Sequence, residues 1–143
     1  MKLLLPSCLA AVCLLSLDAC KSGPAPVKIA GTCLFKDVHE VTSSAGNKMA
    51  EGEMVLTLTG PGTTPASIEI KRALMTSDGF GNDEIIEEVV IDPAASRHMT
   101  APGTVTLPFS MGFSGVSLSL LELTLNVDGK YEVVEIHPTV TPR

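Results

Sequence analysis

The three histidines, His39, His98 and His137, are the side chains with the widest chemistry here, because imidazole binds metals and exchanges protons near neutral pH. No two of them are close in the sequence, whereas a zinc site normally shows two ligands a few residues apart. We therefore expect the histidines to lie at the surface, in loops or at strand ends, and we predict no metal site.

The densest group of carboxylates lies in the segment 83–92 and comprises Asp83, Glu84, Glu87, Glu88 and Asp92. Clustered carboxylates can bind calcium, which takes about six to eight oxygen ligands, but the regular Asp spacing of a calcium loop is missing here. If the segment is a strand, Glu84, Ile86 and Glu88 share one face. If it is a helix, Glu84, Glu87 and Glu88 share one instead, and in both cases we expect a solvated acidic face.

Motifs for nucleophilic catalysis and phosphate binding are missing from the sequence. Ser114 lies near glycines, but it lacks the Gly-x-Ser-x-Gly elbow and the strand–turn–helix context of a hydrolase nucleophile. The stretch 60–64 is rich in glycine but lacks the lysine of a phosphate-binding loop. The methionines are dispersed, which favours core packing over a soft copper site. We predict a non-enzymatic protein with no catalytic residue and no cofactor.

Strands must position these residues, since Val, Ile, Thr and Leu dominate the region after residue 26 and Gly and Pro interrupt it. The apolar pattern predicts strands at 27–30 with 33–35, 36–41, 53–59, 67–76, 104–111, 116–127 and 131–136. The segment 84–92 carries Ile and Val at helical spacing, with a residue that could cap a helix before it, but its β-branched content favours a strand.

Three local signals refine this pattern. Asp128-Gly129 predicts a type I′ hairpin turn, because both central positions of that turn need positive φ. The apolar phase slips at Leu120-Leu121, which indicates a β-bulge or a strand covered on both faces. Pro108 falls on the polar phase of its strand, and this position is typical of an edge strand.

Seven to eight short strands with Gly and Pro turns predict an all-β protein, either a sandwich or a barrel. We favour an antiparallel β-sandwich of immunoglobulin-like size, formed by a single domain over 27–143. The chain contains no tryptophan, so the Cys–Trp–Cys signature of true immunoglobulin domains is absent.

Three strand sequences resemble, in their order, those of arrestin-like and sporulation-control-type sandwiches. They are a Gly-Glu strand at 52–60, an Ile-Glu-Ile strand at 68–70 and a Pro-Phe strand at 104–111. The matches are short, and the resemblance implies a β-sandwich with a scaffold or partner-binding role. It transfers no site residue.

The N-terminus has the parts of a secretory signal, namely a basic residue, an apolar segment over 3–17 and a small residue before Cys20. The apolar segment is too short for a membrane span, which needs roughly 20 residues. Leu17-Asp18-Ala19-Cys20 resembles a bacterial lipobox, with Asp18 departing from the uncharged residue usual at its position. The resemblance implies a bacterial lipoprotein: residues 1–19 are removed as a signal peptide, and Cys20 carries lipid on its sulfur and an acyl chain such as palmitate on its amine. A conventionally secreted protein and an uncleaved N-terminal anchor are the alternatives.

The residues after the cysteine extend this interpretation. Lys21 and Ser22 follow Cys20 with no Asp, which resembles sorting to the outer membrane in enteric-type bacteria. Gly and Pro make the segment 20–26 an extended tether. Since two or more acyl chains anchor a protein stably, we expect a lipid-anchored protein of the bacterial cell envelope, in the outer membrane and facing the periplasm.

Cysteine usage is consistent with this location. Cys8 and Cys13 lie in the signal segment and Cys20 carries lipid, so Cys33 is left without a disulfide partner. We expect Cys33 to be buried on a strand as a small apolar side chain. If Cys20 is not lipidated, a Cys20–Cys33 disulfide remains open, because both would lie in an oxidising compartment.

The formal net charge of −6 without a basic cluster excludes nucleic-acid binding. Only 3% of the residues are aromatic, so stacking platforms for bases or sugars are scarce. We expect a non-enzymatic protein-binding or structural role, with membrane lipid held through Cys20 and an envelope protein as partners. The alternative is a periplasmic lipoprotein that binds a small ligand or a metal through the histidines, the acidic segment 83–92 or the methionines.

Overall fold

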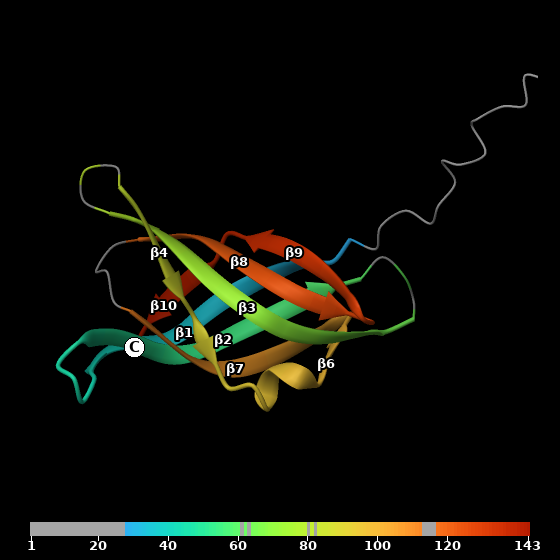
Figure 1. The fold of residues 1–143 in the computed structure, drawn as a ribbon, viewed down its shortest axis with the longest axis horizontal. Helices are drawn as coiled ribbons and strands as arrows, with labels where there is room; N and C mark the ends of the chain where they lie inside the picture. The colour runs from blue at the N-terminus through green and yellow to red at the C-terminus, as the bar shows by residue number, and fades with distance from the viewer. Residues whose placement is uncertain (1–27, 61, 63, 80, 82, 113–116) are drawn as a thin grey trace, which may run out of the picture.

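The computed structural model describes residues 28–60, 62, 64–79, 81, 83–112 and 117–143. The predicted signal peptide 1–19 and tether 20–26 lie outside these residues. The described chain forms ten strands and a short 3-10 helix (Figure 1). Their bounds are β1 Ala30–Thr42, β2 Lys48–Thr59, β3 Ala66–Asp78, β4 Glu84–Glu88, β5 Val90–Ile91, η2 Ala95–Arg97, β6 Met99–Ala101, β7 Gly103–Gly112, β8 Leu118–Val127, β9 Lys130–Ile136 and β10 Thr139–Pro142.

The strands form two five-stranded sheets that pack face to face. Sheet A has the order β10-β1-β2-β7-β5, and sheet B has the order β4-β3-β8-β9 with β6 also paired to β3. Every pairing is antiparallel except that of β1 with β10. In Figure 1, β3 and β8 of sheet B lie over β1 and β2 of sheet A. The predicted all-β sandwich is therefore confirmed.

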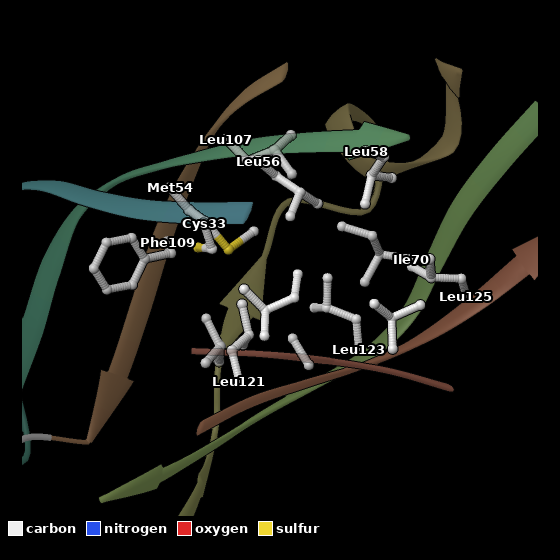
Figure 2. Packing of buried hydrophobic residues seen from close by; sticks show 14 of the residues in the cluster. Cys33, Met54, Leu56, Leu58, Ile70, Leu107, Phe109, Leu121, Leu123 and Leu125 are labelled. Atoms are coloured by element: carbon white, nitrogen blue, oxygen red, sulfur yellow. The ribbon is translucent and has the colours of Figure 1, made fainter. Parts of the chain in front are cut away.

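The core lies between the two sheets and follows the alternation of each strand. On β2, Met54, Leu56 and Leu58 are at most 1% exposed, while their neighbours Val55 and Thr57 are only half-buried. Figure 2 shows these three side chains pointing toward the leucines of β8. On β8, alternation buries Leu121, Leu123, Leu125 and Val127. Since a strand exposes successive side chains on opposite sides, a period of two residues suffices to build this core.

Methionines fill much of the space that the scarce aromatic residues leave. Met54, Met75, Met99 and Met111 are buried, and Met49 is half-buried. The prediction that they pack the core is confirmed. Phe35 and Phe109 meet edge to face with their ring centroids 4.7 Å apart, which adds an aromatic contact between β1 and β7.

The segment 84–92 is extended, so the favoured strand prediction is confirmed over the helix. It is nevertheless two strands in different sheets: β4 pairs with β3 of sheet B, and β5 pairs with β7 of sheet A. Val89 lies between them, 3% exposed, and its N–H donates to the carbonyl of Ala73 over 2.9 Å. The prediction of a single strand is wrong, because the chain passes from sheet B to sheet A at the buried Val89.

The β8–β9 hairpin has the predicted turn. Asp128 has φ 48° and Gly129 has φ 88°, as a type I′ turn requires. The Asp128 carboxylate also accepts a 2.9 Å hydrogen bond from the N–H of Ser67 on β3. This bond ties the turn to the neighbouring strand and fixes the register of three strands of sheet B.

The bulge predicted near Leu120-Leu121 is found one residue earlier. Thr76 pairs with Leu120 and Ser77 with Leu118, so Ser119 is the extra residue of β8. Its hydroxyl donates to the carbonyl of Thr76 over 3.0 Å. The additional residue shifts the apolar phase of the strand, as the sequence indicated.

The described chain has ten strands where the sequence predicted seven to eight, and three short strands account for the difference. β6 lies in the segment 94–103, which the pattern leaves as a loop, and β10 and β5 are the other two. The edge position expected for Pro108 is corrected, because β5 borders β7. β5 pairs only with Phe109 and Ser110, and Pro108 directly precedes these two residues.

Candidate functional site

The three histidines lie apart on the surface of the sandwich. His98 and His137 are exposed as expected, whereas His39 is half-buried within β1. The Nδ1 atom of His137 lies 2.9 Å from the Ser119 carbonyl, and that of His39 lies 2.9 Å from the Asp37 carbonyl. No three His, Cys, Asp or Glu side chains gather as a metal site in the described part of the chain.

Cys33 is buried in the core, 4% exposed, as the sequence predicts. Burial among apolar side chains raises the pKa of its thiol to about 12. A thiol with such a pKa stays protonated at neutral pH and is a poor nucleophile. Cys20 lies outside the described residues, so lipidation and the Cys20–Cys33 disulfide both stay predictions.

The acidic segment presents the face that a strand requires. Glu84, Ile86 and Glu88 are exposed, while Ile85 and Glu87 are half-buried on the other side of β4. The exposed carboxylates belong to a solvated face, as expected.

A groove of about 540 Å³ lies on the outer face of sheet A. We call it the His39 groove. Its lining includes His39 and Arg143 together with the carboxylates of Asp37, Glu51, Glu53 and Asp92. Its Glu51, Glu53 and Asp92 side chains are exposed, so water reaches the groove freely. Small-molecule sites are instead concave and mostly apolar, and they bury most of the ligand.

A bulge in β1 shapes the His39 groove. Asp37 has φ 54°, and the pairing of β1 with β2 shifts between Lys36 and His39. The bulge brings two carbonyls close to Gly52 on β2. A Cβ atom on Gly52 would lie 2.7 Å from the Lys36 carbonyl oxygen, which is closer than real Cβ contacts occur. Glycine is therefore required at position 52 for β1 to bend here.

The outer face of sheet B carries a different arrangement, which the sequence analysis missed. The strand register lines up Glu88, Leu74, Glu122 and Glu135 across β4, β3, β8 and β9. We call Glu88, Glu122 and Glu135 the carboxylate row. Glu122 lies directly opposite Glu135, and like charges in that position destabilise a sheet. None of the three forms an ion pair among the described residues.

Exposed apolar side chains flank the carboxylate row. Ile86 is 62% exposed on β4, and Val133 and Tyr131 are 62% and 70% exposed on β9. On β8, alternation places the half-buried Leu120 on the same outer face. This face therefore combines unpaired negative charge with apolar area in contact with water.

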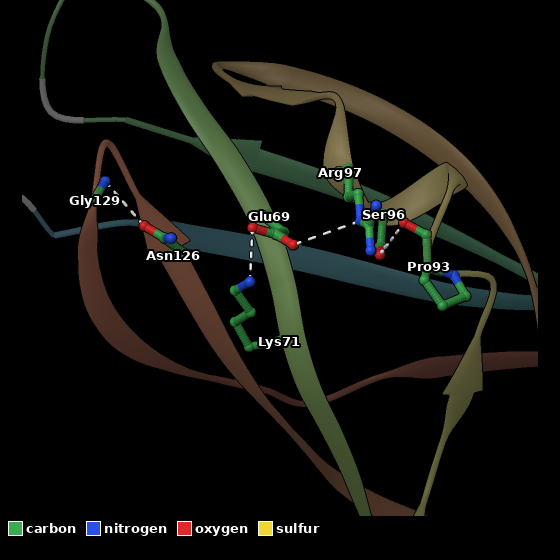
Figure 3. A network of polar contacts seen from close by, with 7 residues as sticks. All are labelled: Glu69, Lys71, Pro93, Ser96, Arg97, Asn126 and Gly129. Atoms are coloured by element: carbon green, nitrogen blue, oxygen red, sulfur yellow. Dashed lines mark hydrogen bonds and ion pairs between the residues drawn. The ribbon is translucent and has the colours of Figure 1, made fainter.

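The cations near this face are mostly held at one end of it. Figure 3 shows Glu69 between Lys71 and Arg97, with Lys71 Nζ 2.9 Å from Glu69 Oε2 and Arg97 Nε 3.9 Å from Glu69 Oε1. Arg72 is exposed on β3, opposite Thr124 in the next row of the sheet. Glu69 therefore engages Lys71 and Arg97 away from the carboxylate row.

The sequence did contain a signal for part of this row. A two-residue turn at Asp128-Gly129 pairs Val127 with Lys130, and counting back from that pair places Glu122 opposite Glu135. The addition of Glu88 could not be counted in this way, because it depends on the pairing of β3 with β8 and with β4.

No protein-family model matches this chain, and no match is found among the curated proteins or the solved structures. The resemblance to arrestin-like sandwiches thus stays a prediction. In the described residues, no helix has the length and apolar character needed to cross a membrane.

Proposed function

We propose that this protein is a lipid-anchored, non-enzymatic component of the bacterial cell envelope that binds a protein partner. The lipobox-like Leu17-Asp18-Ala19-Cys20 supports the anchor. The outer face of sheet B supports the binding role and is the observation that carries it. Tyr131 and Val133 are exposed on β9 near the unpaired Glu122 and Glu135, and this combination of apolar area and negative charge supports an interaction surface.

The described residues offer little for catalysis. The thiol of Cys33 is buried, and its raised pKa keeps it protonated. The His39 groove is open to water, whereas catalytic groups act in enclosed sites where a low dielectric strengthens their interactions. A binding role instead requires exposed apolar side chains and charged groups, and the outer face of sheet B carries both.

The anchor is tested by replacing Cys20 with serine. We expect the wild-type protein to be recovered in the membrane fraction with an intact mass that includes the lipid. We expect Cys20→Ser to fold normally and to leave the membrane fraction. A Cys20→Ser protein that unfolds would instead favour the Cys20–Cys33 disulfide, and a wild-type mass without lipid would refute the anchor.

The binding role is tested in intact cells with photo-crosslinking amino acids placed one at a time on exposed positions of both sheets. We expect a discrete adduct with one envelope protein from at least one outer face, reproduced at neighbouring positions of that face. Crosslinks that are absent or diffuse from every position of both sheets would refute a protein-binding role.

A ligand-binding lipoprotein is the second candidate: the His39 groove lacks the enclosure of a typical small-molecule site, but it gathers four carboxylates with His39 and Arg143. This candidate predicts bound metal after native purification, or a rise in melting temperature with one member of a panel of small cationic ligands. Replacing Glu51 and Glu53 together with glutamine would abolish that rise, because both carboxylates line the groove.

A further inference from the structure

We infer that the β8–β9 half of the outer face of sheet B is a docking site for an extended protein segment in which a basic residue stands between two apolar residues, two positions away on either side. This inference rests on the proposed protein-binding function and names the surface and the chemistry of the partner.

The negative charge of Glu122 and Glu135 favours a cationic side chain on the partner. Glu122 and Glu135 face each other across β8 and β9, with no cation paired to either among the described residues. Such a pair lowers the stability of the sheet, and a Lys or Arg side chain placed between the two carboxylates would relieve the repulsion. The most favourable occupant is therefore cationic at this point.

The spacing of the side chains on the outer face of β8 favours an extended partner segment. Leu120, Glu122 and Thr124 follow each other on the outer face of β8, and Thr124 pairs with Val133. Rows on one face of a sheet are about 6.8 Å apart, because each row advances by two residues of about 3.4 Å. The β8–β9 half thus presents the half-buried Leu120, then the Glu122 and Glu135 pair, and then Thr124 beside the exposed Val133. An extended segment has the same spacing between alternate side chains, so apolar-x-basic-x-apolar matches it.

Three other occupants fit this face less well. A second copy of the chain would bring two carboxylate rows together, and an anionic membrane surface would be repelled by the same charge. A segment carrying a basic side chain over β3 would meet Arg72 in the row of Thr124. Arg72 therefore directs the basic residue toward β8 and β9, where Glu122 and Glu135 lie.

The size of the face indicates a reversible complex. The two strands β8 and β9 span roughly 10 Å and the seven residues of β9 roughly 24 Å, so the flat area of this half of the face is roughly 240 Å². Stable complexes bury about 800 Å² on each partner, and transient ones bury less. We expect weak, salt-sensitive binding.

The test uses a fluorescent synthetic peptide with repeats of Val-Ser-Lys-Ser-Val and the protein purified from whichever cell fraction holds it. Binding is followed by fluorescence anisotropy at low and at physiological salt. We expect Glu122→Gln with Glu135→Gln to weaken binding about tenfold. The matched control, Asp78→Asn with Glu84→Gln, removes the same charge from a facing pair on β3 and β4, outside the β8–β9 half, and should leave binding unchanged.

Two more reagents isolate the apolar part of the site. Val133→Ser should weaken binding without unfolding the protein, since Val133 is 62% exposed. A peptide with repeats of Ser-Ser-Lys-Ser-Ser should bind more weakly than the valine peptide. Equal loss in the Asp78→Asn, Glu84→Gln control, equal binding of the two peptides, or no binding by the wild-type protein would each overturn the inference.

The outcome separates this inference from the function on which it rests. A discrete photo-crosslink that comes only from sheet A, together with failed peptide binding, would preserve a protein-binding role and reject this face. The absence of a discrete crosslink from both sheets would reject the role itself.

Discussion

Two residues, Cys33 and Gly52, show how single side chains set the properties of this sandwich. Cys33 occupies a core position where a charge would lose its hydration, and so its thiol stays neutral. Gly52 has no side chain, which lets the carbonyls of the β1 bulge approach β2 closely. Burial determines the protonation state of Cys33, whereas the missing side chain of Gly52 allows β1 and β2 to approach each other closely.

The buried thiol makes stability depend on alkaline pH. The pKa of Cys33 rises from 9.0 to about 12 on folding, so the unfolded chain loses this proton first as the pH increases. The stabilising effect is complete below about pH 9 and is lost as the pH rises toward about 12. We expect the melting temperature of the wild type to fall more steeply over this range than that of Cys33→Ala. Parallel pH profiles would contradict this.

The close approach at Gly52 predicts a cost for any side chain. Gly52→Ala should destabilise the fold by about 1–3 kcal/mol in denaturant unfolding, because the new Cβ atom would overlap the Lys36 carbonyl oxygen. Gly62→Ala is the control, since a Cβ atom there would have its nearest neighbour 3.9 Å away. Equal stability of Gly52→Ala and wild type would show that the bulge can relax.

At the scale of elements, the β8–β9 hairpin combines a favourable turn with an unfavourable cross-strand pair. The positive φ angles of Asp128 and Gly129 fit the type I′ turn, and they hold Glu122 opposite Glu135. Stability and charge therefore conflict within one hairpin, which is the kind of local conflict expected where a surface serves binding.

This conflict predicts a stabilising substitution. Glu135→Lys should raise the free energy of unfolding by about 0.2–1 kcal/mol, because it converts a like-charge pair into an opposite-charge pair. The gain should shrink in high salt, which screens exposed charges. The substitution Glu53→Lys on the opposite sheet is the reverse test and should lower the free energy of unfolding, since Glu53 lies opposite Lys36 and the change creates a like-charge pair. A destabilised Glu135→Lys would refute the repulsion.

At the scale of the whole molecule, the chain crosses between the sheets several times. Sheet A holds β1, β2, β5, β7 and β10, and sheet B holds β3, β4, β6, β8 and β9. Strands that follow one another in the sequence therefore often lie in different sheets. Val89 marks one of these crossings and is buried between the sheets. Neither sheet is a continuous segment of sequence, so neither is expected to fold alone.

We therefore expect unfolding in a single transition. Far-ultraviolet circular dichroism and the NMR signals of the buried methyl groups should give the same denaturant midpoint. Val89→Ala should lower the free energy of unfolding by about 1–3 kcal/mol with both probes, whereas Val90→Ala, at an exposed neighbour, should change it by less than about 0.5 kcal/mol. Separate midpoints for the two probes would show that the sheets unfold independently.

Local sequence accounted for much of the fold. Alternation predicted the central strands, and Asp128-Gly129 predicted the hairpin turn, because both depend on interactions between residues close in the chain. The bulge at Ser119 was indicated by the phase slip beside it. The short strands β6 and β10 had no such pattern, since their existence depends on the strands they pair with.

The amino-acid sequence by itself determined that the net charge is negative, and it predicted the main strands, their buried faces and the burial of Cys33. Only the tertiary structure decided how 84–92 is divided between two sheets and which carboxylates form a row. The physical reason is that side-chain alternation is a property of neighbouring residues, whereas the row of Glu88, Glu122 and Glu135 depends on the pairing of strands distant in the sequence.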